Sequence, residues 1–309
     1  MSGQVTYRRR DIAAVHRLQG PLIVAYLCYS VWGAAYAAPQ LRDLAAAPVI
    51  ATAIANALLL VAGLALNTVI DLDGDRNDND KTALVGAAVR VGPVRLWQWV
   101  IIEGVTGLAL AGAVTAITGR WLPAAAALLT AGAHWSYNWG PPPRHRGFKH
   151  RGFFGAAVFG TATGTLPCLL AAGALPSTLP ASVWLIFVSL GVYSTGRTAW
   201  WSVPDIEADR AAGAGTPSGQ HGVARTIARS TLIMFAGSLG LAAGFAWRYG
   251  PWWACAAVIH LAVLVIALGP ILRAQRQTPA VMAWLRKRLL FVVVVGEVLI
   301  LAVAVTHLV

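Results

Sequence analysis

The sequence predicts an all-α membrane protein, a polytopic bundle of nine transmembrane helices. Hydrophobic residues make up 57% of the 309 residues, and charged residues only 12%, about half the share in a soluble domain. Several apolar runs exceed the roughly 18–20 residues that a helix needs to cross a bilayer. The connections between these runs are short, so we expect one transmembrane domain over residues 1–309 and no separate soluble part.

Nine apolar runs supply the expected spans, and each lies between basic or turn-forming segments. In order along the chain they cover residues 21–39, 47–70, 93–118, 121–138, 153–175, 181–203, 226–247, 252–272 and 288–308. The last run ends almost at the final residue.

The basic residues predict how these spans are oriented. Of 24 Lys and Arg residues, about twenty lie in the N-terminal segment or in every second connection, and about three lie in the alternate connections. Basic residues accumulate on the cytoplasmic side of membrane proteins. We therefore expect a multi-pass protein of the cell membrane with a cytoplasmic N-terminus and an external C-terminus. The net charge of +12 is explained by this asymmetry, so we expect lipid and not nucleic acid as its partner.

The acidic residues are concentrated in two short stretches, at residues 71–80 and 205–209, both on the predicted cytoplasmic side. Asn67, Asp71 and Asp75 are spaced i, i+4, i+8 at the end of the second span, and this spacing places them on one face of a helix. Asp205 and Asp209 have the same i, i+4 spacing, and we expect them at the end of the sixth span. Two helix ends on one side of the membrane would then present facing carboxylates.

Carboxylate and amide oxygens are hard ligands suited to Mg²⁺, which binds through one or two carboxylates together with substrate phosphates. The two stretches therefore predict a Mg²⁺-bridged diphosphate site, with metal ligands Asn67, Asp71, Asp75, Asp205 and Asp209. A calcium-binding EF-hand is excluded, because Arg76 and Thr82 occupy positions that require Gly and Glu. A solvated acidic loop is the plainer alternative, but two matched clusters in a chain otherwise poor in acids count against it.

These motifs resemble those of the UbiA-type intramembrane prenyltransferases. Asn67-x-x-x-Asp71-x-x-x-Asp75 is similar to their first motif. The segment from Ser202 through Asp205 and Asp209 to Gly213 and Thr216 resembles their second motif, in the style of the homogentisate and chlorophyll branch. The loop with Tyr137, Pro141-Pro142-Pro143, Lys149 and Arg151-Gly152 resembles a third element of that branch. The family's fold is a nine-helix bundle with a cytoplasmic-facing site. The chain departs from the pattern at Thr68, at Lys81-Thr82-Ala83 and at Trp201-Ser202.

The resemblance implies Mg²⁺-dependent transfer of a prenyl group from an allylic prenyl diphosphate to a small aromatic or lipophilic acceptor in the membrane. Asp71, Asp75, Asp205 and Asp209 would be the catalytic residues, acting through the metal. A UbiA-type terpene cyclase, which needs no acceptor, is the alternative that Thr68, Trp201 and Ser202 motivate. A transporter is less consistent, because it would need acids within the spans.

A diphosphate also needs direct cationic partners. The candidates are Lys149, Arg197, Arg144, Arg146, Lys81 and Arg210, although basic residues at these places also serve as topology signals. Lys149 and Arg197 are favoured, the latter because an Arg within a span needs a partner. Asn56, Glu103 and Glu297 are further candidates for the cavity, whereas we interpret His134 and His260 as packed histidines.

Overall fold

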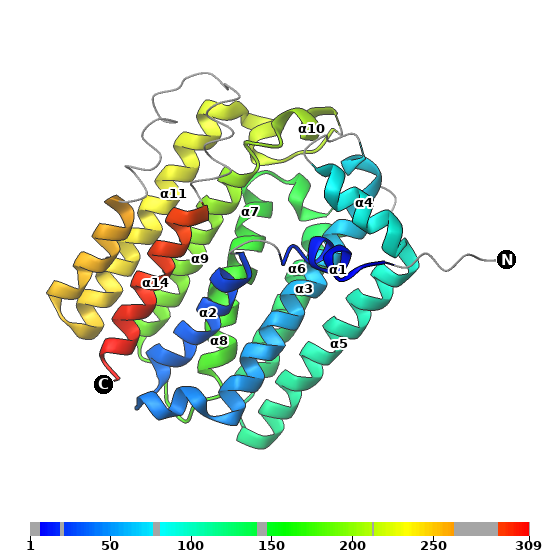
Figure 1. Cartoon of the computed structure of the whole chain (residues 1–309). Coiled ribbons are helices and arrows are strands. Elements are labelled where there is room, and N and C mark those ends of the chain that lie inside the picture. Colours follow the sequence, from blue (N-terminus) through cyan, green and yellow to red (C-terminus); the bar gives the residue numbers. More distant parts are fainter. Residues whose placement is uncertain are drawn as a thin grey trace.

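The computed structural model describes residues 7–18, 22–76, 81–140, 147–211, 213–262 and 290–308. Within these ranges the protein consists of helices and contains no strand. Figure 1 shows the long helices lying side by side as a bundle. The all-helical fold class is thus as the hydropathy predicts.

The helices correspond to the expected spans, but the seventh begins nine residues earlier than expected and the second ends five residues later. They are α2 (Leu22–Ala37), α3 (Ala47–Asp75), α5 (Pro93–Thr118), α6 (Leu122–Asn138), α7 (Phe153–Gly160) continuing through the π-helical turn η4 (Thr161–Thr165) into α8 (Leu166–Ala172), α9 (Ala181–Trp201), α11 (Pro217–Tyr249) and α14 (Leu290–Thr306). Of the eighth expected span, residues 252–253 belong to the 3₁₀ turn η5 (Pro251–Trp253), residues 254–262 are helical, and residues 263–272 lie outside the described residues.

Four helical stretches in the described residues are long and apolar enough to cross a membrane, by length and composition. They are Ala47–Asp75, Pro93–Thr118, Phe153–Ala172 and Pro217–Tyr249. The number nine for the transmembrane helices therefore stays a prediction.

Glycines allow close contact between helices that frame the bundle. A Cβ on Gly196 of α9 would lie 2.6 Å from the Ser230 carbonyl oxygen of α11, and one on Gly237 of α11 would lie 2.6 Å from the Tyr193 nitrogen of α9. Small residues at such interfaces let helix backbones approach closely in a membrane, where hydrophobic burial does not drive helices together. The two helices on either side of the second acidic motif are therefore closely packed.

Three short helices, α1 (Arg9–Val15), α4 (Thr82–Val91) and α10 (Ile206–Ala211), connect to or cover the long ones. Figure 1 shows α4 and α10 at the same end of the bundle. An ion pair of 2.6 Å joins Arg90 at the end of α4 to Asp11 of α1. The acidic motifs belong to this end, since α3 ends there at Asp75.

The second acidic motif differs from the expectation in one respect. We expected Asp205 and Asp209 at the end of the sixth span, but α9 ends at Trp201, Asp205 immediately precedes the separate helix α10, and Asp209 lies within α10. The Asp209 nitrogen donates to the Asp205 carbonyl oxygen at 2.8 Å. The reason is Pro204, which has no N–H to donate and disfavours helical geometry at the residue before it. The i, i+4 relation survives because α10 restarts the helix.

Candidate active site

The first acidic motif occupies the last turns of α3, as the spacing predicts. Asn67 Nδ2 donates to Asp71 Oδ2 at 2.7 Å and to Asn138 Oδ1 of α6 at 2.9 Å. Asn138 is buried, so it fixes the orientation of the Asn67 amide. With the Nδ2 group engaged in this way, Oδ1 is the acceptor atom of the Asn67 side chain, and Arg17 Nη2 donates to it at 2.7 Å.

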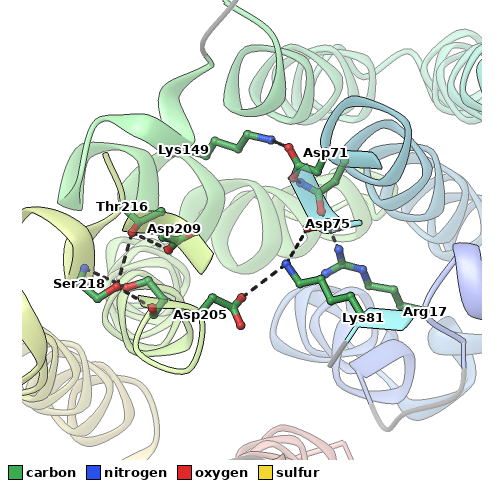
Figure 2. Close-up of polar contacts among 11 residues, drawn as sticks. Arg17, Asp71, Asp75, Lys81, Lys149, Asp205, Asp209, Thr216 and Ser218 are labelled. Carbon is green, nitrogen blue, oxygen red and sulfur yellow. Dashed lines mark hydrogen bonds and ion pairs between the residues drawn. The ribbon is translucent and has the colours of Figure 1, made fainter. Parts of the chain in front are cut away.

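Two lysines pair with the aspartates of this motif. Lys149, from the 3₁₀ turn η3 (Phe148–His150), forms an ion pair with Asp71. Lys81 Nζ lies 2.8 Å from Asp75 Oδ1 and 4.0 Å from Asp205 Oδ2. Figure 2 shows Lys81 between the two motifs and Lys149 reaching Asp71 from the opposite side. Lys81 thus links Asp75 of α3 to Asp205, which immediately precedes α10 and lies 130 residues further along the sequence.

The second motif is held by the start of α11. Thr216, the N-cap of α11, donates to Asp209 Oδ2 at 2.7 Å and accepts from the Gly219 nitrogen at 3.3 Å. Burial raises the pKa of the Asp209 carboxyl to about 6, Asp205 nearby adds to this rise and the Thr216 hydrogen bond opposes it. A nearby cation favours the ionised form of such a carboxyl, so this carboxylate is suited to a metal or other cation.

Backbone contacts join the loop that carries Lys149 to the second motif. The Gly152 nitrogen donates to the Gly215 carbonyl oxygen at 2.8 Å. Gln220 Nε2 donates to the same oxygen at 2.9 Å. Gly152 has φ 57°, a left-handed conformation that glycine adopts without strain, and a Cβ there would meet the Gln220 side chain. The Lys149 loop and the second motif therefore form one connected unit facing α3.

The donor set fits Mg²⁺ shared with a diphosphate. No three His, Cys, Asp or Glu side chains among the described residues lie close enough together to hold one ion. Mg²⁺ does not require such a group, because it binds through one or two carboxylates and completes its shell with phosphate oxygens and water. Hard oxygen atoms of this kind are available on both sides of the site. They belong to Asn67, Asp71 and Asp75 on one side and to Asp205 and Asp209 on the other. A diphosphate between the motifs would complete the coordination.

The other predicted site residues lie in several places. Arg210 is exposed on α10, and Arg144 and Arg146 lie outside the described residues. Arg197 is buried in the bundle, where Nη1 pairs with Glu297 Oε1 at 2.6 Å and Nη2 donates to Ser194 Oγ at 3.2 Å. Its role as a diphosphate clamp stays a prediction.

The remaining cavity candidates also have polar or packing partners. Glu297 also accepts from the Tyr29 hydroxyl, and Glu103 pairs with His16 at 2.9 Å. His260 is buried beside the Tyr193 hydroxyl. His134 is buried as well, with its ring against Phe159. The packed interpretation of the two histidines agrees with these contacts.

Sequence reasoning missed two residues of the site, Arg17 and Asn138. Arg17 Nη2 donates to Asn67 Oδ1 at 2.7 Å. Arg17 is one of four arginines in the N-terminal segment, and that clustering is also typical of a topology signal. Asn138 directly follows Tyr137 of the third motif, so an amide at the end of an apolar span was the available signal.

Comparison with known proteins agrees with the helical fold. The model of the UbiA prenyltransferase family matches residues 26–295. A UbiA homologue from Archaeoglobus fulgidus bound to DMAPP and Mg²⁺ is 14% identical, with a TM-score of 0.66 over 96% of this chain and 99% of that one. The apo structure of a UbiA homologue from Aeropyrum pernix K1 is 18% identical, with a TM-score of 0.66 over 93% of this chain and 98% of that one. Comparison with curated protein sequences finds no match. The chain belongs to the UbiA prenyltransferase family.

Proposed function

We propose that this protein transfers a prenyl group from an allylic prenyl diphosphate to a small aromatic or lipophilic acceptor, with Mg²⁺ as cofactor. The observation that carries the proposal is the convergence of two acidic motifs and two lysines, with Lys81 contacting both Asp75 and Asp205. Solved UbiA homologues from Archaeoglobus fulgidus bind DMAPP or GPP together with Mg²⁺, which supports the same ligands here.

The residues have distinct roles in this reaction. Asn67, Asp71 and Asp75 hold one side of the metal–diphosphate unit, and Asp205 and Asp209 hold the other. Bound Mg²⁺ would supply Lewis-acid stabilisation of the charge that develops on the departing diphosphate.

The basic residues complete the diphosphate site. Lys149 and Lys81 would donate to phosphate oxygens of the bound diphosphate. Further candidates for this role are Arg144, Arg146, Arg197 and Arg210. Thr216 keeps the Asp209 carboxylate pointing into the site.

The chemistry after ionisation needs an apolar and water-poor space. Below the motifs, α3 and α9 continue as apolar helices whose inner residues are buried, including Leu64, Leu66 and Tyr193. An allylic cation formed at the motifs would lie next to this interior, away from bulk water. The acceptor carbon attacks the cation and then loses a proton, while the prenyl tail extends among the helices. The positive-inside asymmetry supports a cytoplasmic location for the diphosphate site in the cell membrane.

A second candidate is a terpene cyclase, in which the cation closes on its own tail. One observation favours it: polar side chains at the positions that depart from the family pattern are engaged within the protein. The Thr68 hydroxyl donates to the Leu64 carbonyl oxygen at 3.0 Å and is buried. Ser202 Oγ donates to the Ala199 carbonyl oxygen and accepts from the Ser218 nitrogen at 3.2 Å. These groups are therefore poorly placed to bind an acceptor.

The experiment that tests the proposal uses the purified full-length protein with Mg²⁺ and a panel of prenyl diphosphates, with and without aromatic and lipophilic acceptors. Mass spectrometry identifies prenylated and cyclised products, and a colorimetric assay measures released diphosphate. A product that requires an acceptor supports transfer, and a product formed without one supports cyclisation. Diphosphate release that is absent under all conditions, or unchanged by EDTA, would refute Mg²⁺-dependent ionisation.

A further inference from the structure

Arg17 has an unusual backbone for its residue type. Its φ is 52°, and it is the one non-glycine residue in the described ranges with a positive φ. A left-handed conformation is strained for a side chain with a Cβ and persists where the surrounding structure imposes it. Because Arg17 also contacts Asn67 of the first motif, its strained conformation needs a structural or functional explanation.

The surroundings of Arg17 hold it from three directions. Asp11 of α1 is paired with Arg90 of α4 at 2.6 Å. His16, next to Arg17, is paired with Glu103 of α5 at 2.9 Å. The Thr68 hydroxyl contacts the Val15 carbonyl oxygen at 3.3 Å, which joins α1 to α3. These contacts fix the end of α1 directly against the α3 motif.

The fixed backbone places the guanidinium group at the first motif. Nη2 donates to Asn67 Oδ1, whereas the buried Nε–H has no hydrogen-bond partner within the described parts of the chain. Figure 2 shows Arg17 reaching the motif from the same side as Lys81. A planar guanidinium presents its N–H groups as a fork that matches the oxygen atoms of a phosphate. An unsatisfied donor on this fork, next to a predicted metal ligand, indicates an anionic ligand.

We propose that Arg17 is a diphosphate-binding residue, supplied to the site by the short helix α1. This inference rests on the proposed function, since it assumes that a diphosphate lies between the two motifs. Arg17 would be a third cation beside Lys81 and Lys149, and it would contact a phosphate oxygen through the N–H groups that Asn67 does not use. The competing explanation is that Arg17 only anchors the N-terminal segment to α3.

Three variants of the full-length protein distinguish these roles. Arg17→Gly removes the cation and suits the left-handed backbone, so the fold should be unharmed. Arg17→Lys keeps the charge but loses the fork. Arg10→Ala is the matched control, because Arg10 is an exposed arginine on the same helix. The probe is inorganic diphosphate with Mg²⁺, measured by isothermal titration calorimetry in detergent, with thermal unfolding followed in parallel.

The expected result is that Arg17→Gly binds Mg²⁺–diphosphate at least about tenfold more weakly than wild type, as for loss of one charge-assisted contact. Its melting temperature should be unchanged or higher. Arg17→Lys should fall in between, and Arg10→Ala should match wild type.

Two outcomes would overturn the inference alone. One is wild-type affinity in Arg17→Gly, and the other is a loss of affinity that is matched by a fall in melting temperature. If wild type binds no Mg²⁺–diphosphate at all, the proposed function fails together with this inference. If wild type binds it and Asp71→Asn does not, the proposed function stands whatever Arg17 does.

Discussion

Lys149 offers the sharpest test of how the site binds its anion. Its side chain is only 10% exposed and is paired with Asp71. Arg151, two residues later, is exposed and lies 5.1 Å above the Phe148 ring. The two residues lie in the same loop and each carries one positive charge, but only Lys149 faces the acidic motif. The variants Lys149→Met and Arg151→Met therefore form a matched pair.

The expected difference follows from these environments. A hydrogen bond to a charged group contributes about 1.5–3 kcal/mol, so removing Lys149 from a bound diphosphate should weaken binding or turnover roughly 10- to 150-fold. An exposed cation–π contact contributes about 0.5–1 kcal/mol, and that of Arg151 acts on the loop and not on the substrate. If both residues only attracted anionic lipid, each would contribute about 1 kcal/mol to membrane binding, and the two variants would behave alike.

The measurement is Mg²⁺–diphosphate affinity by calorimetry and diphosphate release by colorimetry, for both variants in the same detergent. Thermal unfolding serves as the control, because loss of Lys149 also leaves Asp71 without its lysine partner. Lys149→Met should reduce affinity much more than Arg151→Met at comparable stability. Equal and small effects of the two substitutions would refute the role of Lys149 and restrict the supported site to the acidic motifs.

Three further predictions concern the metal, its ligands and the topology. Asp71→Asn and Asp205→Asn should each abolish diphosphate release in folded protein, because each removes the charge of a proposed metal-binding carboxylate. Full activity of either variant would contradict this, and so would full activity of wild type in EDTA. Thr216→Val should lower turnover roughly 10- to 150-fold, because it removes one hydrogen bond to a carboxylate, worth about 1.5–3 kcal/mol. Thr216→Ser keeps the hydroxyl and should retain turnover. Wild-type turnover in the valine variant would count against the role. Single cysteines in place of Ala214 and Arg120 should be labelled from opposite sides of the membrane, with the cysteine at position 214 labelled from the cytoplasm. Labelling of both cysteines from one side would contradict the predicted orientation.

The sequence predicted the features that depend on local periodicity. The i, i+4, i+8 spacing of Asn67, Asp71 and Asp75 requires only that α3 continues to Asp75, and it does. Apolar runs likewise predicted the bounds of α5 and α6 to within a residue. Such features were predictable because helix geometry and bilayer thickness determine them without knowledge of distant contacts.

Features that depend on long-range contact were not predictable in the same way. The sequence placed Arg17 among topology signals, because its contact with Asn67 requires the docking of α1 on α3 and α4. The partner of Arg197 is Glu297, 100 residues further along the chain. Arg197 was visible in the sequence as a charge within a span, whereas Arg17 was not, and the spacing of charges cannot identify partners on different helices.

The contacts at the first motif bear on the order in which ligands bind. Asn67, Asp71 and Asp75 have Arg17, Lys149 and Lys81 as their respective cationic partners, and these come from three different segments of the chain. If these residues hold Mg²⁺ as proposed, a metal ion that binds alone would have to displace the cations from the oxygen atoms. A metal ion that arrives with a diphosphate would provide the displaced cations with new anionic partners. We therefore expect binding of the two ligands to be coupled through the protein's own ion pairs, so that the aspartates alone would not determine affinity for the metal.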